Sequence, residues 1–217
     1  MANNKKRKKG AVTISLGLLL LSAAVGLTVY NVFTAQKASD TSAAMLVELA
    51  PAIETQSPQI PAPEPSAEPA LEEVEIPDYV LVPEMEMPTA EAYGFDCIGI
   101  LEIPSLELQL PVIGDWSYDN LKNAPCRYSG SAYTGDLVIA GHNYDSHFGS
   151  LTDLSLDDEI VFTDIDGNVF RYAVAEFETL EPTAIDSMTA GMYDLTLFTC
   201  TISGHARFTI RAELKTN

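Results

Sequence analysis

Basic residues are scarce in most of this sequence. Beyond residue 39 there are 31 acidic residues against six basic ones, a formal net charge of −25 for this part. The imbalance argues against nucleic-acid binding, because phosphate contacts need clustered lysine and arginine. It is typical of a solvated acidic surface and would favour cationic partners. The six basic residues are Lys122, Arg127, Arg171, Arg207, Arg211 and Lys215.

Charge is absent from one long stretch near the start. Residues 11–33 are uncharged and rich in Leu, Val and Ala, and a helix of about 20 such residues spans a bilayer core. Five basic residues precede it, which predicts a cytoplasmic tail over 1–10 and an extracellular remainder. A cleaved signal peptide has an apolar core of about 7–15 residues and a small-x-small site. No such site follows here, so we expect an uncleaved, single-pass signal anchor in the cell membrane.

The next segment, 34–92, has too little apolar content to predict a core of its own. Nine prolines lie between Pro51 and Pro88, interleaved with Glu and Ala. Such a composition predicts an extended, extracellular linker. The short apolar run 79–82 could still dock on the domain that follows.

Long helical patterns are missing after Tyr93, where short apolar runs alternate with turn residues. This pattern predicts an all-β domain over 93–217 with about eight strands, as a closed β-barrel or a sandwich. The expected strands are 98–103, 106–112, 136–140, 158–163, 169–177, 195–200 and 208–214, with short helices at 117–121 and 148–154.

One loop has the start of a calcium-binding pattern but lacks the rest of it. Asp164-x-Asp166-Gly167 could open an EF-hand loop, yet the later ligands are missing. A tight hairpin with positive φ at Gly167 or Asn168 explains the same residues. We expect no metal site here.

Cysteine and histidine occur only three times each. Cys97 and Cys126 could form a disulfide in an exported chain, although two reduced structural cysteines are the favoured interpretation. His147 is expected in an exposed loop and His205 in a solvent-facing turn, so that neither is the preferred functional histidine.

The remaining cysteine and histidine both follow apolar strands. Cys200 ends the strand 195–200, and the strand 136–140 runs into Gly141-His142-Asn143. A thiolate is the strongest side-chain nucleophile, a nearby cation stabilises it, and an imidazole can exchange protons with it. Arg207, at the start of the next strand, supplies such a cation, whereas a surface salt bridge suffices for Arg211, on the same strand face. The alternative is that Cys200 is a small buried hydrophobe.

The segment Thr196-Leu197-Phe198-Thr199-Cys200 with Arg207 resembles the TLxTC…R signature of sortases, the membrane-anchored cysteine transpeptidases of Gram-positive bacteria. Ala140-Gly141-His142-Asn143 is similar to their catalytic-histidine segment. The resemblance extends from about Ile98 to Leu214 and implies a closed sortase-type barrel. It selects His142 among the three histidines.

The resemblance also implies a mechanism. Cys200 attacks the threonine carbonyl of a sorting-signal peptide, Arg207 stabilises the oxyanion, and His142, as imidazolium, protonates the departing amine. An amine of peptidoglycan or its lipid-linked precursor then attacks the thioester. Thr199 and Asn143 are expected at the substrate, and no cofactor is expected.

Three absences bear on the alternatives. An L,D-transpeptidase-like enzyme has a glycine directly before its cysteine, and Thr199 stands there instead. Pilus-building sortases carry an Asp-Pro-aromatic lid and often a C-terminal anchor, and neither is found here, which favours a class D-like or unclassified sortase. A non-catalytic surface scaffold, with Cys200 buried, is the alternative from another class.

Overall fold

The structure is a computed structural model that describes residues 2–56, 76–201 and 203–215. Contacts divide the chain into two units, 1–37 and 38–217. In the first unit, helix α1 (Ala2–Gln56) begins, and its large apolar side chains from Ile14 to Phe33 are exposed. In the described part of the chain, one helix, over Ile14–Ile53, is long and apolar enough to cross a membrane by length and composition.

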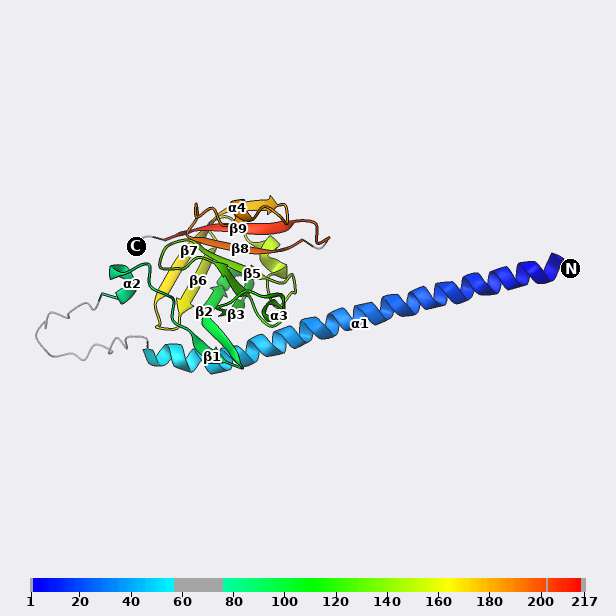
Figure 1. Cartoon of the computed structure of the whole chain (residues 1–217), viewed down its shortest axis with the longest axis horizontal. Coiled ribbons are helices and arrows are strands. Elements are labelled where there is room, and N and C mark those ends of the chain that lie inside the picture. The colour runs from blue at the N-terminus through cyan, green and yellow to red at the C-terminus, as the bar shows by residue number, and fades with distance from the viewer. Residues whose placement is uncertain (1, 57–75, 202, 216–217) are drawn as a thin grey trace, which may run out of the picture. The chain divides into compact units, whose positions relative to one another are not determined.

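The second unit is built on a sheet that closes into a barrel. Nine strands follow the order β1-β2-β3-β4-β5-β8-β9-β7-β6 in the described residues, and an additional β2–β6 pairing joins the two sides. Strand β1 therefore lies outside the closed eight-stranded ring, paired only with the start of β2 (Figure 1). The strands are β1 (Ala90–Ala92), β2 (Phe95–Ile103), β3 (Leu108–Ile113), β4 (Cys126–Ser129), β5 (Leu137–Gly141), β6 (Glu159–Asp164), β7 (Val169–Leu180), β8 (Leu195–Cys200) and β9 (Arg207–Leu214).

The helices of this unit are short and lie between strands. They are α2 (Asp78–Leu81), α3 (Tyr118–Leu121), α4 (Ile185–Met188) and the 3₁₀ turns η1 (Pro104–Leu106) and η2 (Gly149–Asp153). The predicted helices at 117–121 and 148–154 are confirmed, and so are all seven predicted strands, with ends moved by up to three residues. Strands β1 and β4 were missed because each has four residues or fewer, too few to show an alternation.

The β6–β7 hairpin confirms the turn predicted from Asp164 to Asn168. Thr163 pairs with Val169, and Gly167 has φ +82°. The Asp164 carboxylate is occupied inside the turn, because it accepts hydrogen bonds from Asn168 N, Asn168 Nδ2 and the Tyr133 hydroxyl at 2.7–2.8 Å. This turn therefore uses its first aspartate to close the hairpin.

Helix α1 continues into the segment that the sequence predicted to be an extended linker. The interpretation of 34–92 as an extended linker is wrong for residues 34–56, which are helical. From Ala38 onward one stripe of the helix is buried against the barrel, with Met45, Leu49 and Ile53 at most 6% exposed and packed in one cluster with barrel residues. The cyan end of α1 lies beside β1 in Figure 1, where Glu48 accepts a hydrogen bond from Tyr93 N.

The part of the predicted linker nearest the barrel is also ordered in part. The Tyr79 ring stacks on the Tyr133 ring with centroids 4.7 Å apart, and Met87 is buried. Docking of the run 79–82 is therefore confirmed for Tyr79, while its neighbours Val80, Leu81 and Val82 are exposed. The Pro-rich residues 57–75 lie outside the described residues.

Candidate active site

Strand register brings Cys200 and Arg207 together. The antiparallel pairing of β8 with β9 sets Cys200 directly opposite Arg207, with Thr199 opposite Phe208. Directly opposite residues on paired strands have Cβ atoms about 4.5–5.5 Å apart. Six residues separate the two strands, and Thr201 N donates to Ala206 O at 3.0 Å, which holds that pairing at the strand ends.

The parallel pairing of β5 with β8 brings the histidine to the same edge. Gly141 lies opposite Thr199, so His142 and Cys200 are the next residues along two adjacent parallel strands. Gly141 is required here by space, since a Cβ at this position would lie 2.4 Å from the Phe148 ring. The sheet therefore delivers His142, Cys200 and Arg207 to one end of three neighbouring strands.

A cavity of about 280 Å³ opens beside the cysteine. One side of the cavity is lined by residues of β8 and β9, namely Thr199, Cys200 and Arg207. The other side is lined by residues of the segment 181–188, which includes α4. Cys200 is a free, half-buried thiol, so the alternative of a fully buried cysteine does not describe it. His142 and Asn143 belong to the adjoining loop rather than to the described lining of this cavity.

Aromatic side chains form one wall of this cavity. The rings of Trp116 and Tyr128 meet edge to face at 5.5 Å, and those of Tyr128 and Phe198 at 5.3 Å. All three line the cavity together with Tyr118. The sequence reasoning missed this wall, because Trp116 and Tyr128 come from a loop and a four-residue strand that show no pattern on their own.

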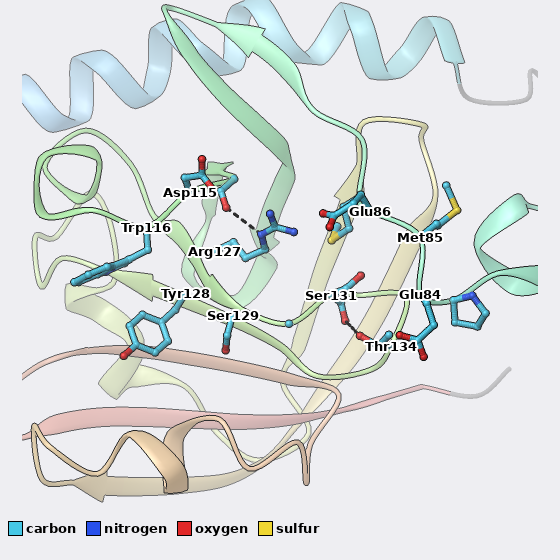
Figure 2. Close-up of a pocket in the computed structure, with 14 residues that line it drawn as sticks. Glu84, Met85, Glu86, Asp115, Trp116, Arg127, Tyr128, Ser129, Ser131 and Thr134 are labelled. Carbon is cyan, nitrogen blue, oxygen red and sulfur yellow. Dashed lines mark hydrogen bonds between the residues drawn. The ribbon is translucent and has the colours of Figure 1, made fainter.

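A second cavity, of about 510 Å³, shares that wall, since Trp116 and Tyr128 line both. Figure 2 shows the two rings on one side of it and Glu84, Met85 and Glu86 on the other. Arg127 lies between them, and its Nε donates to Gly114 O at 3.0 Å. The two cavities are therefore neighbours separated by a pair of aromatic rings.

Thr196 and Thr199, the two threonines of the TLxTC segment, have different surroundings. The Thr196 hydroxyl accepts a hydrogen bond from Arg211 at 2.9 Å. Thr199 is 4% exposed and lines the cavity, and its Oγ1 has no hydrogen-bond partner among the described residues. A buried hydroxyl without a partner is costly, so Thr199 is a position where the fold carries an unsatisfied polar group.

Arg211 is not the surface ion pair that the sequence predicted. It is 5% exposed, and its Nε donates to Glu178 Oε2 at 2.7 Å. Its other nitrogens donate to Thr196 and to the backbone carbonyls of Ser187 and Met188. The interpretation failed because β9 passes under the 181–188 segment, which covers the outer face of this strand at Arg211.

The histidines differ sharply in burial. His205 is exposed, as predicted, but His147 is fully buried rather than exposed. Burial lowers the pKa of His147 to about 4, helped by the charge of the neighbouring His142. Burial, followed by the Lys122 charge, also lowers the pKa of His142 from its ordinary value, and the His142 ring stacks on Tyr144 with centroids 4.7 Å apart.

The other two cysteines are free and fully buried, which confirms the interpretation of two reduced structural residues. Burial raises the pKa of both Cys97 and Cys126 to about 12. Because the thiolate is the reactive form, both thiols are inert at neutral pH. No group of three or more His, Cys, Asp or Glu side chains able to hold a metal ion occurs among the residues that the structure describes.

Comparison with known proteins identifies the family. A sortase-domain model matches residues 101–215, more than half of the chain, and the chain therefore belongs to the sortase family. Membership of this family implies cysteine transpeptidase activity. No curated protein matches the chain.

The chain is also similar to solved structures of sortases. The Clostridium perfringens sortase D5 transpeptidase is 24% identical, with a TM-score of 0.50, and the match covers 56% of this chain and 80% of that one. C. perfringens sortase C, solved with the C-terminal cell wall sorting motif, is 23% identical (56% and 72% covered, TM-score 0.49). Streptococcus suis sortase C1 is 25% identical (56% and 74% covered, TM-score 0.48). The first of these shows that the barrel is of the sortase type.

Proposed function

We propose that this protein is a membrane-anchored transpeptidase that cleaves a sorting signal after threonine and transfers the acyl group to a cell-wall amine. The proposal rests above all on one observation: a free, half-buried Cys200 directly opposite Arg207 in a cavity large enough for several side chains. A cysteine, a proton carrier and a cation at one site are the groups that acyl transfer needs.

In this mechanism His142 begins as the base. Its lowered pKa keeps the imidazole neutral in most molecules at neutral pH, so it can take the Cys200 proton as sulfur attacks the threonine carbonyl. The carbonyl oxygen becomes an oxyanion that the Arg207 guanidinium stabilises. The tetrahedral intermediate collapses, the peptide C–N bond breaks, and His142 returns its proton to the departing amine, which leaves a Cys200 thioester.

Transfer reverses these steps. An amine of peptidoglycan, or of its lipid-linked precursor, attacks the thioester carbonyl and gives a proton to His142. A new amide bond forms, the C–S bond breaks, and the proton returns to Cys200. We assign Thr199, which lines the cavity, to position the substrate backbone, and Asn143, exposed next to His142, to contact the substrate at the rim.

The long apolar helix supports placing this reaction at the cell membrane. In this arrangement residues 1–10 are a cytoplasmic tail, 11–33 cross the membrane once, and the rest is extracellular. The catalytic domain comprises 93–217 together with the docked helical residues from Ala38 onward. Membership of the sortase family supports a sorting-signal peptide as the first substrate.

The decisive experiment is acylation of the full chain, in detergent micelles, by a library of threonine-containing sorting peptides. We expect mass spectrometry to find the N-terminal peptide fragment on Cys200 in the wild type and not in Cys200→Ala. Cys97→Ala is the matched control, because a thiol with a pKa of about 12 cannot compete, and it should label fully. Absence of peptide-dependent labelling in the wild type would overturn the proposal.

A further inference from the structure

The docked part of α1 touches the loop that carries His142. Ser42 is 3% exposed, and its Oγ donates to Asn123 O at 2.9 Å and lies 3.2 Å from His147 Nε2. A hydroxyl has one proton, and here Asn123 O, which can only accept, takes it. The His147 ring also hydrogen-bonds to the backbone of Ala38, and its Nδ1 has no partner among the described residues. Two groups of α1, Ser42 Oγ and the Ala38 backbone, therefore face Nε2, which carries the proton of this buried, neutral imidazole.

The loop from His142 to Gly149 then links that contact to the histidine of the active site. Phe148 N donates to His142 O, and both His147 N and Gly149 N donate to Tyr144 O, each at 2.9 Å. The Tyr144 ring lies between the two imidazoles, 4.7 Å from His142 and 5.7 Å from His147. A displacement of His147 would therefore shift the Tyr144 ring, which packs directly on the His142 ring.

Helix packing holds Ser42 at a fixed depth. Met45, one turn further along, and Leu49, two turns along, are fully buried in the cluster that includes Ala140 of β5, two residues before His142. Ala38 and Thr41 are buried on the same stripe. The helix thus contacts both the strand that leads to His142 and the loop that follows it.

We propose that the α1 segment from Ala38 to Ile53 is a positioning element for His142, acting through the Ser42–His147 hydrogen bond. The inference deepens the proposed function and takes the catalytic role of His142 from it. The coupling between the helix and the His142 loop does not depend on the proposed function. Ser42 and His147 are positioning residues, because neither lines the Cys200 cavity described above. The enzyme is therefore complete only when the helix next to the apolar span is docked.

The test is an NMR titration of the histidine rings in the full chain, held in micelles, for wild type, Ser42→Ala and Val47→Ala. Alanine preserves the helix, and Val47, 75% exposed on the same segment, is the matched control. Ser42→Ala should raise the pKa of His142 toward its ordinary value, because a loosened loop admits water. Lys122, Tyr144 and His147 also face this ring, and Cys200 ends the adjacent strand, so all are kept unchanged in this comparison.

A second variant removes the same hydrogen bond from the other side. His147→Leu should shift His142 in the same direction, and the double variant should shift it little further, since coupled residues are not additive. With an active peptide, Ser42→Ala should lower kcat at least about three-fold at unchanged KM, because small misplacements of a catalytic group are costly.

An unchanged His142 titration in Ser42→Ala, or an equal shift in Val47→Ala, would overturn the inference. This readout needs no substrate. A wild type that fails to form the thioester would reject the proposed function, while the titration would still decide whether the helix and the loop are coupled.

Discussion

At the residue scale, the two arginines of β9 are four positions apart and have different surroundings. Arg207 is half-buried at the strand end, opposite Cys200, and its Nη1 donates to Ala206 O at 3.4 Å. Arg211 is buried and donates to one carboxylate, one hydroxyl and two carbonyls. The two side chains are chemically identical and lie on the same face of β9. Arg207 nevertheless lines the Cys200 cavity, whereas Arg211 connects α4 to the barrel.

We predict that Arg207→Ala and Arg211→Ala fail in different ways. Arg207→Ala should lower kcat by about 100-fold, the typical cost of losing an oxyanion donor, with little change in Tm. Arg211→Ala should lower the free energy of unfolding by about 3 kcal/mol, because it strands groups that are paired in the fold. Thermal melts and peptide-cleavage kinetics separate the two effects, and equal losses of activity at unchanged Tm would contradict this division.

At the scale of elements, the docked half of α1 is the main departure from the sequence-based expectation. Ala38, Ser42, Met45, Leu49 and Ile53 recur at intervals of three or four and are all buried, which is one face of a helix. The pattern is present in the sequence, but it lies between an apolar span and a Pro-rich run. Composition averaged over 34–92 conceals it.

We predict that this segment contributes to the stability of the barrel. Met45→Ala should lower the free energy of unfolding by about 2–5 kcal/mol, the usual cost of truncating a buried methionine. Val47→Ala, on the exposed face of the same helix, should change it by less than about 0.5 kcal/mol. Urea unfolding followed by tryptophan fluorescence of Trp116 measures both, and similar values for the two variants would show that the helix is a tether only.

At the scale of the whole molecule, the fold depends on closing the sheet between β2 and β6. Gly99 pairs with Asp164 at this seam and with Val112 of β3 on the other side. It has φ +155°, and a Cβ there would lie 2.2 Å from Thr163 O. Only glycine allows the two strands to approach at this point.

We predict that Gly99→Ala is far more destabilising than Gly94→Ala. Both glycines have positive φ, so the conformational cost of alanine, about 1 kcal/mol or more, is common to both. Only Gly99 adds a clash, since nothing lies within 4 Å of a Cβ at Gly94. Thermal melts should show a clearly larger loss of Tm for Gly99→Ala, and equal losses would mean that the seam tolerates opening.

The sequence by itself determined the class of the fold and the order of the chemical groups along it. Alternation in short apolar runs gave seven of the nine strands, and the TLxTC…R segment led to the sortase family, which the domain match to 101–215 confirms. These signals are local, because strand period and turn chemistry are written in consecutive residues. The roles of Cys200, His142 and Arg207 are predictions that the acylation and kinetic experiments will test.

Only the tertiary structure decided which side chains share an environment. His147 and Arg211 looked like surface groups but are buried, and Trp116, Tyr128 and Phe198 form one wall although they come from distant segments. The docking of α1 beside the His142 loop belongs to the same kind of fact. Burial depends on contacts between residues far apart in the chain, such as Ser42 and His147, and no local pattern specifies those contacts.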